Sequence, residues 1–509
     1  MSIRTNLDSK AKVARNTWVT SIGSFFTSLF GLLSFFLVAF FFGAKRETDA
    51  FFAANVLFMF FSVFLSTLRY SVVPLMANFE SKEKLFLLFN KVTIPILSMV
   101  IGISAVVFIL SPQISSLLGT GFDSQTLLKT SSFIRIIAFT GFFQGLGFLC
   151  ASALGTMGNF SVPAYSYAFG NFIWLCSILF LRNLWGMNSV VIGMLASSIF
   201  SSLTQLFYLV KIGYRPKISG SKNSGLSSLY ILKTMILGSG IYVTANLNYA
   251  IGQSLSSHFP QGSATLFAYA ATGTGLLIAV ISYPISLVII PSLSRIKDDK
   301  HMFSKTLSLG IRYNIIFIMP LAFFLSFFRI PILRFFLASS LRNQDINILG
   351  NMILGYSVLV LAYSLDLVLF SAFYSMGKQN FLIFIGLLSI PVNLIASFLG
   401  KYYFGLTGLA IAQSVYTTFI LIVLLFKLTG YVEKGIFINN VKGLGRISFF
   451  AFFSSLTVYF IIHKYFDLSF FIPLLSAMFL SMSLYLILIF IFQPNDIKFF
   501  WSTFTNKEF

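Results

Sequence analysis

Long apolar runs follow one another along nearly the whole chain, and short polar stretches separate them. An apolar helix of about 20 residues crosses the roughly 30 Å hydrocarbon core of a bilayer. Fourteen such runs are present, at approximately 18–42, 50–77, 86–111, 127–154, 160–181, 187–211, 232–256, 265–293, 311–334, 347–375, 381–400, 405–427, 446–463 and 470–492. This pattern predicts an all-α polytopic membrane protein with about 14 transmembrane helices, both of whose termini lie on one side of the membrane.

Short sequences from the first half of the chain recur about 219 positions later, in the same order. The three pairs are Val72–Met76 with Ile289–Leu293, Ser152–Gly158 with Ser371–Gly377, and Leu184–Met187 with Tyr403–Leu406. We therefore predict two pseudo-symmetric six-helix lobes plus two C-terminal helices. The expected segments are an N-lobe at 1–212, a cytoplasmic linker at 213–231, a C-lobe at 232–428, and two additional spans with a tail at 429–509. Internal repeats of this kind are typical of transporters, which bind substrate between the repeats.

The composition supports lipid as the main solvent of the chain. Hydrophobic residues make up 57% of its 509 residues and charged residues 10%, whereas a soluble protein carries about 25% charged residues. The two cysteines, Cys150 and Cys176, fall in apolar runs, and the three histidines are scattered without ligand spacing. A disulfide framework and a metal site are therefore not expected.

The net charge of +21 is distributed between the apolar runs rather than on one continuous basic face, which argues against nucleic-acid binding. Segments on the N-terminal side of the predicted membrane hold 24 Lys and Arg residues, and the opposite segments hold 9. By the positive-inside rule, both termini are expected in the cytoplasm.

No Walker A sequence and no GxGxxG sequence occurs in the chain. The few polar residues within the spans do not form a nucleophile, base and orienting group, so we expect a transporter without enzymatic or ATPase activity. The energy for transport would then come from an ion gradient, the membrane potential or substrate flux. The short outer loops, which carry few acids, argue against a glycan polymerase or transferase.

Four motifs in order resemble one known family. They are Phe42-Gly43-Ala44 followed by Thr48–Ala53, then Leu154–Ala164, Ile290–Arg295 and Phe373–Ser375. These sequences look like the MurJ/MviN family of lipid II flippases, within the multidrug/oligosaccharidyl-lipid/polysaccharide exporter superfamily. The similarity extends from about residue 15 to 430.

The resemblance implies a monomeric flippase of the bacterial cytoplasmic (inner) membrane. It would move a polyprenyl-pyrophosphate-linked sugar, either lipid II or a related lipid-linked oligosaccharide, by alternating access, with spans 13 and 14 forming a groove for the lipid tail. Its partners would be this substrate and membrane lipids. The chain departs from the family at Ser28, Ser34 and Thr272, where the family has cavity arginines. An O-antigen or polysaccharide translocase, an ion-coupled small-molecule exporter and an inactive scaffold therefore stay open as alternatives.

Charged residues within spans are candidates for function, because each costs about 2.5–3.5 kcal/mol at the membrane centre. We predict that Asp49, Arg69 and Arg135 line the substrate cavity, and the resemblance places Asp49 and Arg135 at matching family positions. An arginine suits a pyrophosphate because its planar fork donates two parallel hydrogen bonds. Arg69 alternatively snorkels to the cytoplasmic interface.

A second set of residues is predicted to couple transport to an ion, either Na⁺ or H⁺, and no other cofactor is expected. Asp366 lies deep in an apolar run, where it would exchange a proton, pair with Na⁺ or serve as a structural partner for a neighbour. Asn248, Asn393 and Ser397 stand near positions where the resembled family binds Na⁺. They would otherwise form hydrogen bonds between helices.

Overall fold

The computed structural model describes residues 2–67, 82–215, 228–441, 443–465 and 471–492, and every regular element in these ranges is a helix. The prediction of an all-α membrane protein is therefore confirmed. The chain divides into two compact units, Met1–Thr265 and Leu266–Phe509. Arg69 and the polar centre of the predicted linker lie outside the described residues.

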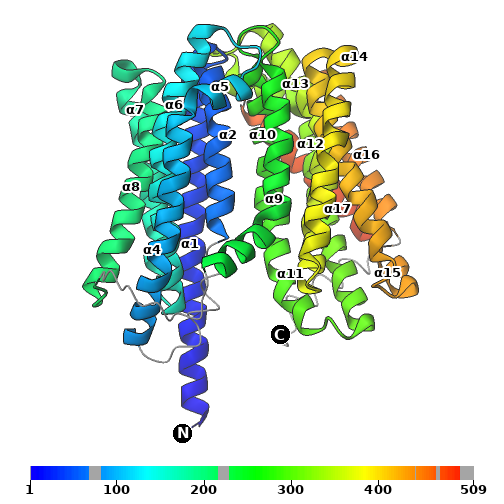
Figure 1. The fold of residues 1–509 in the computed structure, drawn as a ribbon. Coiled ribbons are helices and arrows are strands. Elements are labelled where there is room, and N and C mark those ends of the chain that lie inside the picture. The colour runs from blue at the N-terminus through cyan, green and yellow to red at the C-terminus, as the bar shows by residue number, and fades with distance from the viewer. Residues whose placement is uncertain (1, 68–81, 216–227, 442, 466–470, 493–509) are drawn as a thin grey trace. The chain divides into compact units, whose positions relative to one another are not determined.

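Unit 1 is a bundle of mostly long helices (Figure 1). The packed pairs are α1 with α7, α7 with α8, and α6 with α2, α4 and α8, while α9 packs against α2 and α5. Its helices are α1 (Ser2–Phe42), α2 (Arg46–Ser66), α4 (Lys82–Ile109), α5 (Ser111–Leu118), α6 (Ser124–Thr156), α7 (Ser161–Trp185), α8 (Asn188–Lys211) and α9 (Ser228–Ser256).

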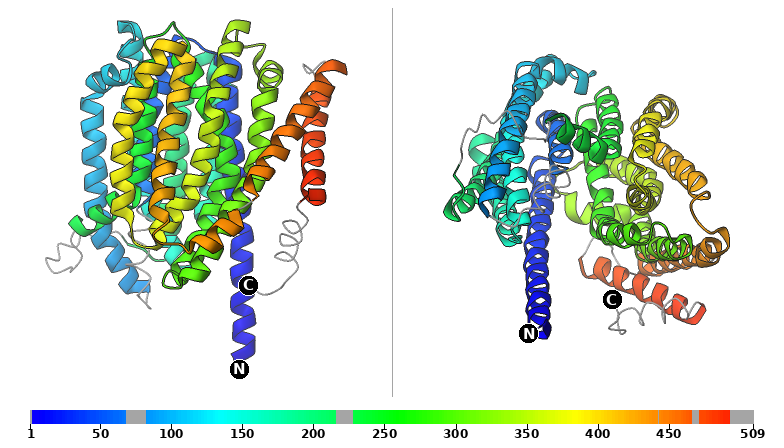
Figure 2. Two further views of the ribbon diagram at one scale, coloured as in Figure 1. Left: turned by 90° about the vertical axis from the view of Figure 1, so that its right-hand side faces the viewer. Right: turned by 60° about the horizontal axis from the view of Figure 1, so that its bottom comes forward.

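Unit 2 is built around α13, which packs against α11, α12 and α14. The last two long helices, α16 and α17, lie side by side and pack on α12 (Figure 2), where Phe324 and Phe328 meet Val458, Ile462 and Leu474 in an apolar cluster. The helices of this part are α10 (Ser263–Leu277, whose first turn belongs to unit 1), the π-helical turn η1 (Ile278–Ser282), α11 (Tyr283–Arg295), α12 (Lys300–Leu337), α13 (Asn343–Ser375), α14 (Gln379–Leu428), α15 (Lys434–Val441), α16 (Leu444–Tyr465) and α17 (Phe471–Phe492).

Eleven described helices are long and apolar enough to span a membrane, with α10, η1 and α11 counted as one continuous helix, Ser263–Arg295. The number is twelve if the bent pair α4–α5 counts as one span. One of the eleven is α14, whose 50 residues correspond to about 75 Å of helix and thus to more than one crossing. Gly405, with φ 58° and ψ −136°, interrupts this helix between the predicted spans 381–400 and 405–427. The predicted span 232–256 lies within α9, which is outside the eleven.

The α4–α5 bend of 72° lies at the end of the predicted span 86–111. Pro112 occupies the first turn of α5, where a proline is tolerated because its missing N–H has no partner in a helix start. Proline cannot continue the hydrogen-bond ladder of α4, so the helix direction changes here.

Three pairs of glycines, each 219 positions apart, have a positive φ at equivalent helix ends. They are Gly43 and Gly262 (61° and 94°), Gly158 and Gly377 (74° and 71°), and Gly186 and Gly405 (53° and 58°). The turns also share hydrogen bonds: Asn159 N–H donates to Leu154 O and Lys378 N–H donates to Phe373 O, both at 2.9 Å. The repeat in the sequence is therefore also a repeat of backbone conformation. The proposed boundaries 1–212, 213–231, 232–428 and 429–509 stay a prediction.

Candidate functional site

Asp49 lies in the first turn of α2 and binds the first turn of α10. Its carboxylate is 3% exposed and accepts hydrogen bonds from the Gly262 N–H at 2.6 Å, from the Thr265 N–H at 2.8 Å and from the Thr265 hydroxyl at 2.6 Å. The first N–H groups of a helix have no partner within the helix, and they favour a negative charge. Asp49 therefore caps α10 from a helix more than 200 positions away in sequence.

Gly262 allows this close approach. It has a φ of 94°, and a Cβ atom at this position would lie 2.7 Å from the carbonyl oxygen of Ala44. Both the backbone conformation and the lack of space therefore require glycine. The loop between α1 and α2 thus fits directly against the α9–α10 connection.

The α5–α6 loop binds the end of α9 next to Asp49. The Gly121 N–H donates to the Ser257 hydroxyl at 2.8 Å, and the Ser254 hydroxyl donates to the carbonyl of Leu117 at 2.9 Å. A cavity of about 250 Å³ lies among these segments. Arg46, Asp49, Asp123, Thr126 and Gln261 contribute its polar lining.

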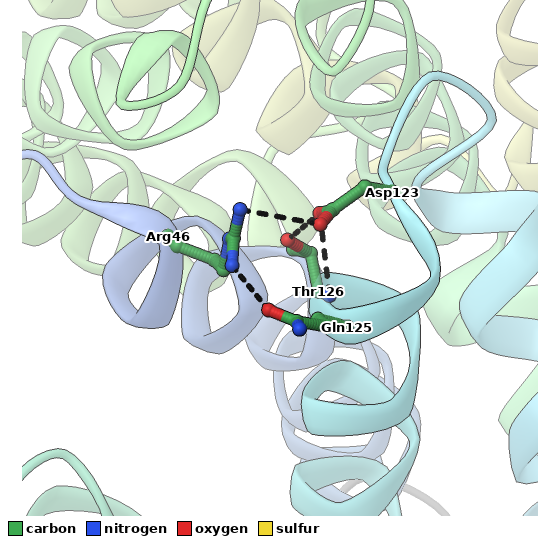
Figure 3. A network of polar contacts seen from close by, with 4 residues as sticks. All are labelled: Arg46, Asp123, Gln125 and Thr126. Atoms are coloured by element: carbon green, nitrogen blue, oxygen red, sulfur yellow. Dashed lines mark hydrogen bonds and ion pairs between the residues drawn. The ribbon is translucent and has the colours of Figure 1, made fainter.

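An exposed network joins α2 to α6 beside this cavity (Figure 3). Arg46 forms an ion pair with Asp123 at 3.3 Å and donates a hydrogen bond to Gln125. The pKa of the Asp123 carboxyl lies below its ordinary value, first because the Thr126 hydroxyl donates to it and also because Arg46 attracts its charged form. A parallel ion pair joins Lys129 to Glu47 at 3.5 Å.

The sequence interpretation did not include Arg46, Glu47, Asp123 and Lys129. Each stands at a helix start or in a connection, where a charge is unremarkable in sequence. Opposite charges before the second and fourth apolar runs would have been a signal. The pairing of Arg46 with Asp123, however, depends on the packing of α2 on α6.

Arg135 lies on α6, is exposed, and faces the bend between α4 and α5. Its Nε donates to the Ser111 hydroxyl at 3.0 Å, and its guanidinium lies 5.7 Å from the centre of the Phe108 ring. Within the described residues, its two terminal nitrogens donate no hydrogen bond, and no carboxylate pairs with it. Asp49 and Arg135 both belong to unit 1, but each has its own separate partners.

The three positions that depart from the family arginines differ in their surroundings. Ser34 is fully buried, and its hydroxyl donates to the carbonyl of Phe30 at 2.8 Å. Ser28 is exposed on α1, and Thr272 is partly buried on α10.

Asn393 and Ser397 come together in unit 2, one turn apart on α14. The amide oxygen of Asn393 accepts hydrogen bonds from the Ser397 hydroxyl and from Gln413 Nε2, both at 3.3 Å. All three side chains are buried and neutral. Asn248 is fully buried on α9 and belongs to unit 1. Asp366 is fully buried on α13 of unit 2.

A family model described as "Lipid II flippase MurJ" matches residues 38–480, which is most of the chain. The chain belongs to the MurJ family.

Curated MurJ proteins match it over most of their length. A probable lipid II flippase MurJ of Buchnera aphidicola subsp. Schizaphis graminum is 26% identical over 436 residues, which cover 80% of this chain and 81% of the relative. The probable lipid II flippase MurJ of Borreliella burgdorferi is 22% identical and covers 89% and 90%. The predicted family is therefore confirmed, and the chain is a membrane transporter of the MurJ family rather than an enzyme.

Solved structures show the same fold. A lipid II flippase MurJ in an inward closed conformation has a TM-score of 0.79 at 21% identity, and the alignment covers 94% of this chain and 99% of that one. A multidrug transporter of the MATE family in an inward-facing conformation has a TM-score of 0.64 at 13% identity. The fold of that MurJ structure thus extends over nearly the whole chain, and the MATE transporter has a similar fold.

Proposed function

We propose that this chain is a lipid II flippase of the bacterial cytoplasmic membrane. Its cargo would be the polyprenyl-pyrophosphate-linked sugar that the MurJ name denotes. The match of the MurJ family model to residues 38–480 carries this proposal. The two units would alternate between inward-open and outward-open arrangements, with both termini in the cytoplasm. The excess of Lys and Arg on the N-terminal side of the spans supports that orientation.

Arg135 is the described cation that best fits the pyrophosphate. Ser111 holds only its Nε, so the terminal nitrogens can donate two parallel hydrogen bonds to a phosphate. The Phe108 ring supports the guanidinium from one side. A phosphate bound here would take the place of the missing acidic partner. Asp49, in contrast, would hold α10 rather than the anionic head group, because its oxygens already accept three hydrogen bonds.

Complementation tests the cargo. The gene is expressed in a bacterium depleted of its own lipid II flippase, and membrane insertion is checked by immunoblotting. We expect growth to be restored. Failure of well-inserted protein to restore growth, combined with rescue of a strain that lacks its O-antigen flippase, would reject lipid II in favour of the polysaccharide translocase.

Substitutions at position 135 test the phosphate contact in the same strain. Arg135→Gln removes the charge and should abolish rescue. Arg135→Lys keeps the charge but cannot donate two parallel hydrogen bonds, so it should restore growth only in part. Arg334→Gln, at an exposed arginine near the end of α12, is the control and should rescue fully. Full rescue by Arg135→Gln would remove this residue from the substrate site.

A further inference from the structure

Asp366 is a buried carboxyl group on α13. Its side chain is 0% exposed, and within the described residues neither of its oxygens accepts a hydrogen bond or forms an ion pair. The contrast with Asp49 is direct, because that buried carboxylate accepts three hydrogen bonds. The two acids therefore do not serve the same purpose.

The helix around Asp366 is held on both sides by bonds from its neighbours. Asn314 of α12 donates to the carbonyl of Ser364 at 2.8 Å, and Ser286 of α11 donates to the carbonyl of Leu367 at 3.0 Å. Ser286 also lies 2.7 Å from the hydroxyl of Ser371. Neutral side chains of α11 and α12 thus bind α13 at positions one and two residues from Asp366. The carboxyl group of Asp366 does not take part in these hydrogen bonds.

The titratable groups around Asp366 are tyrosines. Tyr363 of α13 and Tyr416 of α14 lie near its carboxyl group, and Tyr283 of α11 lies near Tyr363. From α12 and η1, the polar groups in this cluster are the neutral Asn314 and Ser282, which share a hydrogen bond of 3.0 Å. Among the described residues, no Lys, Arg or His forms an ion pair with Asp366.

An ionised carboxylate in these surroundings is very unfavourable. Burying a charge without a partner costs far more than burying a neutral polar group, for which the cost is about 2–7 kcal/mol without a hydrogen bond. A divalent metal cation would also neutralise the charge, but the described residues contain no cluster of three or more His, Cys, Asp or Glu side chains to hold one. Na⁺ needs no such cluster, and the labelling experiment below distinguishes it from a proton. A proton needs no further ligand.

We propose that Asp366 is a proton-binding site whose occupancy changes with the conformation of unit 2. In the packed arrangement of α11, α12, α13 and α14, the carboxyl group carries a proton. When these helices separate, water reaches the group, the proton passes to water, and the ionised carboxylate becomes hydrated. Return to the packed arrangement requires uptake of a proton from the water on the accessible side. Proton binding would thus be linked to the conformational cycle whatever the cargo is.

Two features of the fold support a specific role for this position. The position equivalent to Asp366 in the first half of the chain, 219 residues earlier, is Gly147. A Cβ atom there would lie 3.6 Å from Ser202 and Tyr167, which is ordinary van der Waals contact. A side chain would therefore fit, and the repeated backbone plan does not require a carboxyl group at this position. In addition, η1 interrupts the α-helix next to α13. Such π-helical turns are rare and frequently lie at functional sites, where they provide an alternative helical register.

Labelling with dicyclohexylcarbodiimide tests the protonation state, because this reagent reacts with protonated carboxyl groups in apolar surroundings. The full chain in native membranes is treated at about pH 7, where an exposed aspartate with a pKa of about 3.9 is ionised. Peptide mass spectrometry should locate the label at Asp366. Asp345 is the internal control and should not be labelled, because it forms a bidentate ion pair with Arg342 in the first turn of α13. Absence of label at Asp366, or protection by Na⁺ but not by K⁺, would overturn the proposal.

Transport in proteoliposomes gives the second measurement. An imposed gradient of about one pH unit, which is about a tenfold difference in proton activity, should change the initial rate for the wild type and leave Asp366→Asn unchanged. Asp366→Glu, which restores a titratable group, should recover the response. A gradient response in well-folded Asp366→Asn equal to that of the wild type would contradict the proposal. If lipid II is not the cargo, transport of lipid II fails in all variants, but labelling of the wild type at Asp366 persists, so the two failures are distinguishable.

Discussion

Gly186 and Gly405, 219 positions apart, adopt the same backbone conformation, with φ and ψ of 53° and −136° at the first and 58° and −136° at the second. Each joins two consecutive long helices, α7 with α8 at Gly186 and the two halves of α14 at Gly405. Positive φ with such a ψ is essentially restricted to glycine. The two halves of the chain therefore reverse direction by the same device.

Replacing Gly186 by alanine should lower the free energy of unfolding by about 1–3 kcal/mol, because the Cβ atom forces strain on this backbone conformation. Gly405→Ala should have a similar effect. The thermal unfolding midpoint of detergent-purified protein measures both. Gly102→Ala is the control, since Gly102 lies within α4 and a Cβ atom there would have no neighbour within 4 Å. This substitution should leave the midpoint unchanged or raise it, because alanine favours the helix.

The apolar runs allowed the helices to be predicted, and the recurring sequences that end at Gly158 and Gly377 indicated a repeat, because both depend on local sequence. The bonds of Asp49 could not be predicted in the same way. Its partners lie 213 and 216 positions away, and only the packing of α2 against α9 brings them together. The interpretation of Asp49 and Arg135 as cavity residues stays a prediction, and Arg69 lies outside the described residues.

Replacing Asp49 by asparagine should destabilise the protein by about 1.5–3 kcal/mol, the range for hydrogen bonds to a charged group. The reason is that the amide NH₂ would face the N–H of Gly262 or of Thr265, so that two donors meet in a buried place. The thermal midpoint of purified protein measures the loss. Asp345→Asn, which removes a partly exposed ion pair, is the comparison and should have a smaller effect.

Rescue by the Asp49→Asn variant separates a structural role from a substrate role. If Asp49 only caps α10, lowering the growth temperature should restore both the amount of folded Asp49→Asn protein and the growth of the cells. A folded but inactive variant at every temperature would instead place Asp49 in contact with substrate.

The hydrogen bond from Thr126 and the ion pair with Arg46 should make the contribution of Asp123 to stability depend on pH in the acid range. Because the folded-state pKa of Asp123 lies below its ordinary value, its contribution is fully present above the unfolded-state pKa. It is lost as the pH falls through the folded-state pKa. The thermal midpoints of wild type and Asp123→Asn should therefore differ at neutral pH and converge in acid. A difference that persists when the carboxyl group is protonated would exclude this origin.

Na⁺ should not stabilise the protein through the buried cluster of Asn393, Ser397 and Gln413. The amide oxygen of Asn393 already accepts hydrogen bonds from Ser397 and Gln413. All three side chains are neutral, so none of them offsets the charge of a cation. NaCl and KCl should therefore give the same thermal midpoint for the wild type. Gln413→Glu replaces the donor with a carboxylate beside two oxygen ligands and should create a Na⁺ response. Stabilisation would reach about 2.7 kcal/mol at a concentration one hundred times the dissociation constant. A specific Na⁺ stabilisation of the wild type that Asn393→Ala abolishes would show that the cluster opens to bind the ion.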